Sequence, residues 1–175
     1  KAAGDWGQIL FYGSSVDASY DGNGDYASGS ILEYCTVEYG SGIWIKKGNT
    51  FISQSTIRYN SGTGIKQVFE DNSNSAARLQ ITNNTISNNN ASGYMRAGGI
   101  YISWQGLNTG VITGNTISNN IGSGMYISYS YNPILTNITI SEPSTKFFST
   151  VLVVLPISSL LLKKGSIYTP SGRDF

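Results

Sequence analysis

The chain has 175 residues, about the size of one domain, with 12% charged residues and a formal net charge of +1. This balance excludes the concentrated basic surface that binds nucleic acids, and it argues against a membrane-surface partner. The chain lacks histidine, which is the usual proton shuttle and the commonest transition-metal ligand, and its one cysteine excludes an intrachain disulfide.

The N-terminal segment combines a short apolar strand with a glycine-rich turn. The chain begins at Lys1 without a methionine or a signal peptide, so we expect a mature or excised fragment. Trp6 and the apolar residues 9–11 are expected to form a first coil or its cap. Little charge, together with many Asn, Ser, Thr, Gly and Tyr residues, favours a secreted or cell-surface location.

In the turn that follows, Asp21, Asn23 and Asp25 alternate with glycines. Oxygen ligands at this spacing can wrap a calcium ion, so Ca²⁺ is a candidate ligand here. The same pattern makes an ordinary glycine-rich turn. The bidentate glutamate that closes a calcium-binding EF-hand loop is missing, because Leu32 stands in its place. The sequence therefore implies no required cofactor, with Ca²⁺ at this turn as the alternative.

A short phrase with alternating apolar residues recurs along the middle of the chain. Its five copies occupy residues 32–37, 52–57, 81–86, 112–117 and 135–140. A second phrase, in which glycine precedes a short apolar strand, follows four of them at 41–45, 63–67, 98–102 and 123–127. The irregular spacing is typical of a solenoid whose longer coils carry outward loops. We place those loops at about 68–78, 88–97 and 103–109.

The period-two alternation within each phrase indicates strands with one buried face. Stacked coils would align the apolar residues as three inward ladders. These are Val37, Ile57, Ile86, Ile117 and Ile140; Ile43, Ile65, Ile100 and Met125; and Leu32, Ile52, Ile81, Ile112 and Leu135. Asn84 and Asn115 fall in the column of Cys35 and Ser55, which predicts a short polar stack at one turn. The predicted fold is all-β, a right-handed parallel β-helix of about five to six coils.

The phrases "ITNNTISNN", "ITGNTISNN" and "GGIYIS" resemble those of right-handed parallel β-helix repeat proteins of the pectate-lyase-like superfamily. Residues 4–11 and 30–39 are similar to the start of such domains in large bacterial surface proteins. The resemblance covers about residues 4–141, and it concerns the fold, because the repeat encodes packing. It implies a fragment of a larger bacterial surface or secreted protein.

One outward column of the second phrase is rich in aromatic side chains. It consists of Trp44, Lys66, Tyr101 and Tyr126, and Trp104 lies close by in the sequence. Stacked coils would space these side chains roughly 4.8 Å apart. Such a row is a candidate platform for sugar rings, with the four aromatic residues as the ligand-binding set. Aromatic residues are also good strand formers that stack into ladders for structural reasons alone.

The sequence offers one candidate catalytic cluster, which consists of Lys66, Glu70, Asp71 and Arg78. In the β-helix polysaccharide lyases that the chain resembles, carboxylates bind calcium, and an arginine or lysine abstracts a proton or stabilises charge. The β-helix glycosidases instead use paired carboxylates for acid–base catalysis. Here Glu70 and Asp71 are adjacent, so an extended backbone would point them apart. Glu38 is expected to face Arg58 of the next coil as an ion pair. The sequence therefore favours a module without catalytic activity.

The repeat stops after Ser141. Residues 142–175 contain no asparagine, although the residues before them contain all 16, and this change in composition marks a boundary. We therefore divide the chain into a β-helix repeat domain, 1–141, and a C-terminal segment, 142–175, that caps the last coil or joins copies into a homo-oligomer. The apolar run at 151–162 is too short and too interrupted to insert across a bilayer.

Three functions remain open from the sequence. The preferred one is an extracellular module that binds a polysaccharide or cell-surface glycan, or that serves as an adhesive scaffold. The second is a polysaccharide lyase or glycoside hydrolase. The third is a purely structural solenoid unit that oligomerises. The first is preferred because outward aromatic residues are aligned, whereas acidic residues number only 10 in the whole chain.

Overall fold

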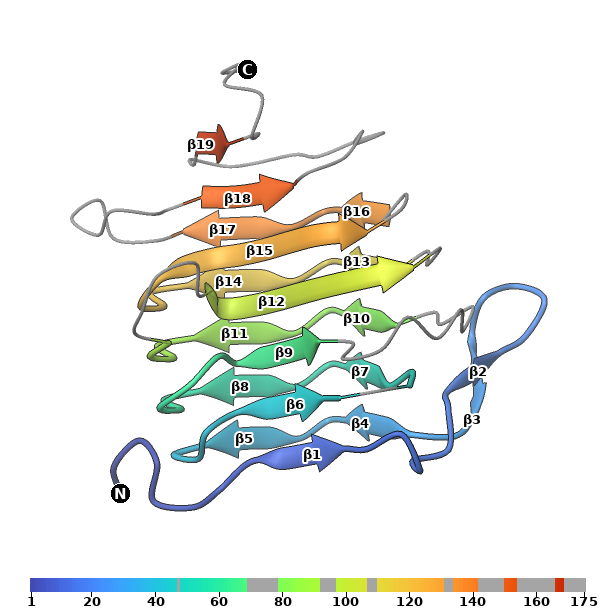
Figure 1. Ribbon diagram of the computed structural model, residues 1–175, viewed down its shortest axis with the longest axis horizontal. Helices are drawn as coiled ribbons and strands as arrows, with labels where there is room; N and C mark the ends of the chain where they lie inside the picture. The colour runs from blue at the N-terminus through green and yellow to red at the C-terminus, as the bar shows by residue number, and fades with distance from the viewer. Residues whose placement is uncertain are drawn as a thin grey trace.

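The computed structural model describes residues 1–46, 48–68, 79–91, 97–106, 110–130, 134–141, 150–153 and 166–168. These residues form β-strands joined by turns, and successive coils stack along one axis (Figure 1). In this part of the chain no helix has the length and apolarity needed to cross a membrane.

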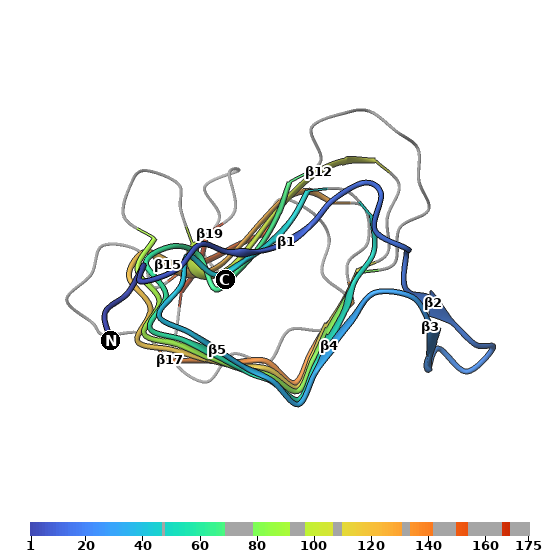
Figure 2. The same cartoon turned by 90° about the horizontal axis from the view of Figure 1, so that it is seen from below.

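Three parallel sheets run along the solenoid, and each contributes one side of its cross-section (Figure 2). The seven-stranded sheet contains β1 (Ile9–Phe11), β6 (Ile43–Ile45), β9 (Ile65–Val68), β12 (Ala97–Gly106), β15 (Ser123–Ser130), β18 (Thr150–Val153) and β19 (Ser166–Tyr168). The β4 sheet contains β4 (Ile31–Glu33), β7 (Phe51–Ser53), β10 (Gln80–Thr82), β13 (Val111–Thr113) and β16 (Ile134–Thr136). The β5 sheet contains β5 (Thr36–Glu38), β8 (Thr56–Arg58), β11 (Thr85–Ser87), β14 (Thr116–Ser118) and β17 (Thr139–Ser141).

One element departs from the parallel stack. Strands β2 (Ser19–Tyr20) and β3 (Tyr26–Ser28) form an antiparallel hairpin between β1 and β4. The hairpin projects from the corner next to β4, outside the cross-section of the stacked coils (Figure 2). The glycine-rich turn with Asp21, Asn23 and Asp25 lies at its tip.

The three aliphatic ladders predicted from the repeat are present in the predicted register. In the β5 sheet, for example, Ile57 pairs with Ile86 and Ile86 pairs with Ile117, and all three are 0% exposed. The other ladder residues are also buried, except that Leu32 in the first coil is only partly buried. Burying one such side chain contributes about 1.5–3 kcal/mol, so these ladders are the main source of stability. The all-β parallel β-helix is confirmed.

The polar stack predicted at the turn between the β4 and β5 sheets is also present. The backbone N–H of Ser55 donates to Oδ1 of Asn84 at 2.9 Å, and the N–H of Asn84 donates to Oδ1 of Asn115 at 2.9 Å. Cys35 begins this column by donating its N–H to Oγ of Ser55 at 3.1 Å. Cys35 itself is partly exposed. Among the described residues, strands β4 and β5 on either side of Cys35 are the edge strands of their sheets.

A second asparagine ladder lies at the turn that follows the β5 sheet, and the sequence reasoning missed it. Oδ1 of Asn60 accepts from the N–H of Gly40 at 3.0 Å, Oδ1 of Asn89 accepts from Asn60, and Oδ1 of Asn120 accepts from Asn89. The three asparagines are at most 1% exposed. Each buried amide therefore satisfies backbone groups that the turn would otherwise leave unpaired.

Both ladders follow a residue with left-handed backbone. The first corner has positive φ at Tyr34, Gln54, Asn83, Gly114 and Asn137, and the second has it at Tyr39, Tyr59, Asn88 and Asn119. This conformation turns the chain sharply between two short strands, and asparagine and glycine tolerate it best. The double asparagines of the repeat are thus explained: the first makes the turn and the second enters the ladder.

Some segments differ from the expected loops. Residues 103–106 continue β12, because its pairing with β15 extends to Gly106 past a register shift. Residues 88–91 form the ladder corner and a bridge between Asn90 and Ile121. In the C-terminal segment, β18 pairs in parallel with β15 and β19 with β18, which lengthens the seven-stranded sheet. The boundary at 141 and the capping or oligomerising role stay predictions.

Candidate functional site

The outward column of the seven-stranded sheet runs in continuous register through β6, β9, β12 and β15. Trp44 pairs with Lys66, Lys66 pairs with Tyr101, and Tyr101 pairs with Tyr126. The residues on either side of Trp44, Ile43 and Ile45, are buried in the core, so the alternation turns the column outward. All four column side chains are partly buried. The alignment predicted from the repeat is therefore present.

The two tyrosines of the column stack on each other. The ring centroids of Tyr101 and Tyr126 are 4.9 Å apart, and the rings are inclined by 7°. This distance matches the spacing of neighbouring strands, about 4.8 Å, so each ring covers one face of the other. Side chains stand roughly perpendicular to a sheet, which directs the phenol hydroxyls outward. The column therefore offers ring edges and polar tips more than the open ring faces expected of a sugar platform.

Two lysines lie over the ring of Trp44. The Nζ atoms of Lys66 and Lys46 are 4.5 and 4.8 Å from its ring, and Nζ of Lys46 is also 5.3 Å from the ring of Tyr12. The negative face of an aromatic ring attracts such cations. Nε1 of Trp44 is buried and has no hydrogen-bond partner among the described residues. A buried donor without a partner costs free energy, so an acceptor on a ligand would gain by reaching it.

The other predicted site residues are placed less completely. Trp104 belongs to β12, but its side chain lies outside the described part of the structure. Glu70, Asp71 and Arg78 also lie outside the described residues. Of the candidate catalytic cluster the structure thus places Lys66, which stands between Trp44 and Tyr101 in the column.

The turn proposed for calcium has an internal hydrogen-bond pattern. Oδ1 of Asp21 accepts from the backbone N–H of Asn23 at 2.9 Å and from that of Asp25 at 3.0 Å. The N–H of Gly24 donates to the carbonyl of Asp21 at 3.1 Å. Within the described ranges no three acidic, cysteine or histidine residues cluster as metal ligands would. The Asp21 carboxylate therefore has a structural use as a turn cap, and calcium binding here stays a hypothesis.

A comparison with protein families places the fold. The model of the family described as the right handed beta helix region matches residues 26–148, which include all five copies of the repeat. The chain belongs to the right-handed β-helix family. No curated protein and no solved structure shows a significant match to it. Membership assigns the architecture, whereas the function has to be argued from individual residues.

In this right-handed β-helix the β2–β3 hairpin packs on the outside of the β4 sheet. The ring of Tyr26 stacks on Phe51 with centroids 5.3 Å apart, and the ring of Tyr20 meets Phe51 edge-on at 6.3 Å. Nε2 of Gln80 donates to the carbonyl of Gly24 at 3.1 Å. These contacts join the projecting hairpin to strands β7 and β10, which belong to two successive coils.

The buried hydroxyl of Tyr20 should make the stability of the protein depend on pH. Burial raises the pKa of Tyr20 far above its ordinary value, and the backbone of Gln80 offsets part of the rise. Above about pH 10 the unfolded chain releases this proton while the folded chain keeps it, so stability should fall as the pH rises. The free energy of unfolding, measured by chemical denaturation at a series of pH values, should therefore fall less at alkaline pH for Tyr20→Phe than for the natural chain.

Tyr12→Phe is the matched control, because Tyr12 is 52% exposed. Removing its hydroxyl should leave the alkaline loss of stability as it is in the natural chain. If Tyr20→Phe and Tyr12→Phe had the same pH profile, burial of the Tyr20 hydroxyl would not be the cause.

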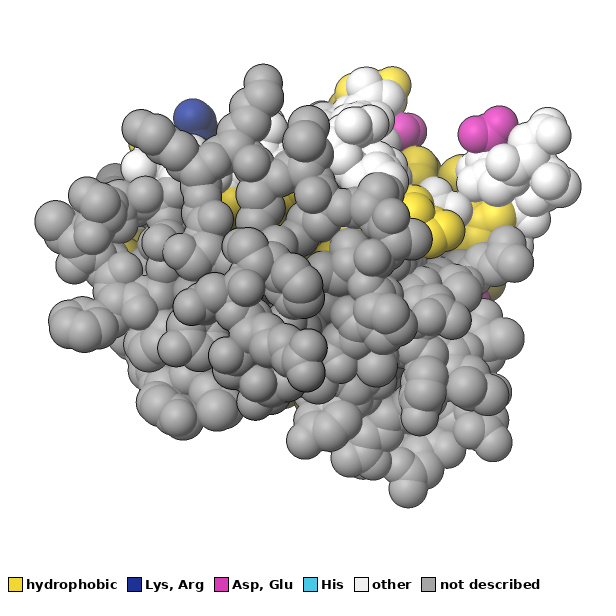
Figure 3. Space-filling model, turned by 90° about the horizontal axis from the view of Figure 1, so that it is seen from above, with side chains coloured by type: hydrophobic (Ala, Val, Ile, Leu, Met, Phe, Trp, Pro, Cys, Tyr) yellow, Lys and Arg dark blue, Asp and Glu magenta, His cyan; other side chains and the backbone are white. Residues whose placement is uncertain are grey.

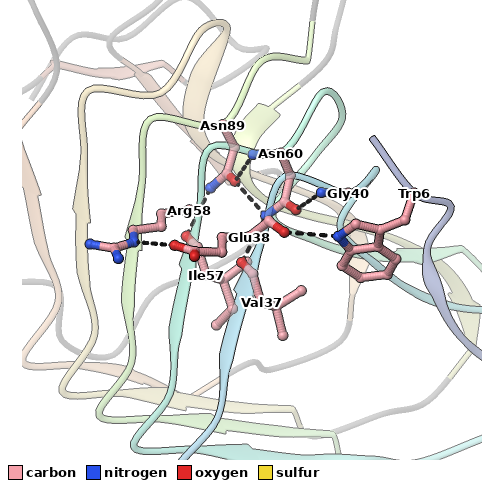
Figure 4. A network of polar contacts seen from close by, with 8 residues as sticks. All are labelled: Trp6, Val37, Glu38, Gly40, Ile57, Arg58, Asn60 and Asn89. Atoms are coloured by element: carbon pink, nitrogen blue, oxygen red, sulfur yellow. Dashed lines mark hydrogen bonds and ion pairs between the residues drawn. The ribbon is translucent and has the colours of Figure 1, made fainter. Parts of the chain in front are cut away.

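The N-terminal end of this β-helix carries a contact that no sequence pattern predicted. Nε1 of Trp6 donates to the carbonyl of Glu38 at 2.9 Å, and its ring lies against Gly40, as the close view shows (Figure 4). Beside it, the predicted ion pair is confirmed, with Nε of Arg58 2.9 Å from Oε2 of Glu38. The hydrogen bond to Glu38 raises the pKa of Arg58. Trp6 thus covers the start of the second asparagine ladder.

Proposed function

We propose that the chain is an extracellular β-helix module that binds carbohydrate along the outward column of its seven-stranded sheet. The observation that carries this proposal is the unbroken register of Trp44, Lys66, Tyr101 and Tyr126 on one partly exposed face. Tyrosine and tryptophan each combine an apolar ring with a polar group, which suits them to a ligand that has both apolar and polar surface.

The geometry suggests how such a ligand would be held. Sugar hydroxyls both donate and accept hydrogen bonds, and the outward side chains of the column carry the phenol hydroxyls of Tyr101 and Tyr126 and the ammonium group of Lys66. The ring edges and the lysine stem add apolar contact area. Because the side chains repeat at about 4.8 Å along the axis, an extended glycan would run parallel to the solenoid and meet one side chain after another.

The proposed partner is a polysaccharide or a cell-surface glycan, and the proposed location is outside the cell. The binding mode uses no metal ion and no covalent chemistry. It also requires no part of the residues 69–78, where the candidate acids Glu70 and Asp71 lie. An adhesive role follows from the same surface if the glycan belongs to another cell.

The test is retention of the pure protein on a panel of soluble and insoluble polysaccharides, with and without calcium. The double variant Trp44→Ala/Tyr101→Ala should reduce the affinity for the retained glycan by about tenfold or more, which corresponds to about 1.4 kcal/mol. Binding constants from depletion isotherms measure the effect, and circular dichroism checks that the variant is folded.

The matched control is a second stacked tyrosine pair, Tyr39 and Tyr59, whose centroids are 5.8 Å apart on another corner. Both have positive φ, so asparagine is the suitable replacement. Tyr39→Asn/Tyr59→Asn should bind as the natural chain does. Equal binding by the column variant would overturn the proposed site. New sugar ends in solution would instead identify an enzyme and direct attention to Lys66 and residues 69–78.

A further inference from the structure

The hairpin tip contains a reactive dipeptide. Asn23 is exposed, and the residue after it is Gly24, which has a φ of +90° and no atom within 4 Å of the position where a Cβ would lie. The side-chain amide of Asn23 makes no hydrogen bond to the described residues, although its backbone N–H donates to Asp21. The space-filling view shows acidic side chains standing out at this corner (Figure 3).

We propose that Asn23 is a site of spontaneous intramolecular modification. The deprotonated backbone nitrogen of Gly24 attacks the side-chain carbonyl carbon of Asn23, a C–N bond forms, and ammonia leaves with the amide nitrogen. The product is a five-membered succinimide. Water then adds to one of its two carbonyl carbons and opens the ring, which leaves either aspartate or isoaspartate at position 23.

Steric freedom at Gly24 makes this reaction selective. A Cβ on the attacking residue would hinder the approach of its nitrogen to the neighbouring side chain, and glycine has none. Glycine also visits the backbone conformations that ring closure requires more readily than other residues. The one restraint on the nucleophile is the hydrogen bond from the Gly24 N–H to the carbonyl of Asp21 at 3.1 Å, which must open first.

The asparagines of the coils provide the contrast. The amide of Asn89 is 0% exposed and bonded on both its oxygen and its nitrogen, so its carbonyl carbon cannot turn toward the next backbone nitrogen. Asn88 is exposed, but the residue after it is Asn89, whose backbone N–H is committed to the ladder. Chemical change should therefore be faster at the hairpin tip than at Asn88 and Asn89.

The modification would alter how the hairpin is held. Isoaspartate inserts one carbon atom into the main chain between Asn23 and Gly24, so the bonds of Asp21 to the backbone of residues 23 and 25 can no longer form together. Either product places a new carboxylate between Asp21 and Asp25. The resulting charge repulsion and altered turn would weaken the bond from Gln80 to Gly24 that holds the tip against β10.

The test is incubation of the full chain in buffers from neutral to mildly alkaline pH, followed by protease digestion and mass spectrometry at intervals. The peptide containing residue 23 should gain the mass difference between an amide and an acid with first-order kinetics, faster at higher pH because the nucleophile must lose its proton. Electron-based fragmentation should find isoaspartate at 23. Asn23→Gln should abolish the change, because its longer side chain closes a less favourable ring.

Exposed Asn88 and buried Asn89 serve as references within the same digest. Both should remain amides while Asn23 is converted. If Asn23 stayed an amide for as long as these two, or if the Gln variant changed at the same rate, the proposal would be overturned.

Discussion

Replacing Asn89 by alanine should destabilise the protein by about 4 kcal/mol, because each buried polar group left without a partner costs about 1–3 kcal/mol. Oδ1 of Asn89 accepts from N and Nδ2 of Asn60 at 3.1 and 2.9 Å. Its Nδ2 donates to the carbonyl of Ile57 and to Oδ1 of Asn120, both at 3.1 Å. Alanine removes all four bonds at a site that water does not reach. Urea or guanidinium unfolding curves give the free energy of unfolding.

Asn88→Ala is the control for this experiment, because it changes the same residue type one position earlier. Asn88 is exposed and has a φ of +56°, so alanine there adds only backbone strain of about 1–2 kcal/mol. A loss at Asn88 as large as that at Asn89 would mean that the turn conformation, and not the buried amide, limits stability.

Gly42→Ala should destabilise the protein by about 3 kcal/mol or more, because left-handed backbone costs a residue with a Cβ about 1–2 kcal/mol and overpacking adds about 1–3 kcal/mol. Gly42 has a φ of +96°, and a Cβ on it would lie 2.0 Å from the carbonyl oxygen of Thr63 in the next coil. A carbonyl oxygen in a stacked backbone cannot move aside as a side chain can. The same unfolding curves measure the effect.

Gly22→Ala is the matched glycine control. A Cβ at Gly22 would have no atom within 4 Å, and its φ is not in the left-handed range. This exposed substitution should change the free energy of unfolding by no more than about 0.5 kcal/mol. If Gly42→Ala were equally harmless, the coils would be able to separate locally at this corner, and the close approach of their backbones would not be a constraint.

The sequence was sufficient to predict the core because each strand repeats one inward residue at a fixed place. Aligning the phrases placed Ile57 over Val37 and under Ile86, and the structure has those pairs. The same alignment placed Asn84 with Asn115. The ladder of Asn60, Asn89 and Asn120 could have been found by the same method, since each lies five residues after a member of the first ladder. It was missed because asparagine at a turn is explained by backbone conformation alone.

The candidate site was predictable only in part. Register follows from the repeat, and so the neighbours of Lys66 were correct. The orientation of the rings does not follow from register. It depends on whether the neighbouring side chain is also an aromatic ring that can stack, as for Tyr101 and Tyr126. The contact of Trp6 with Gly40 and the packing of Tyr26 on Phe51 occur once each, so no periodic pattern in the sequence predicts them.

The asparagine ladders also have a polarity. In the second ladder every Oδ1 accepts from the coil before it, from Gly40 to Asn60, from Asn60 to Asn89 and from Asn89 to Asn120. Amides linked head to tail in this way polarise one another along the line. A following coil stacked upside down would place buried N–H donors against N–H donors, and one displaced by one residue would leave the buried amides without their partners. The direction of these hydrogen bonds therefore favours a single orientation and register for each coil on the one before it.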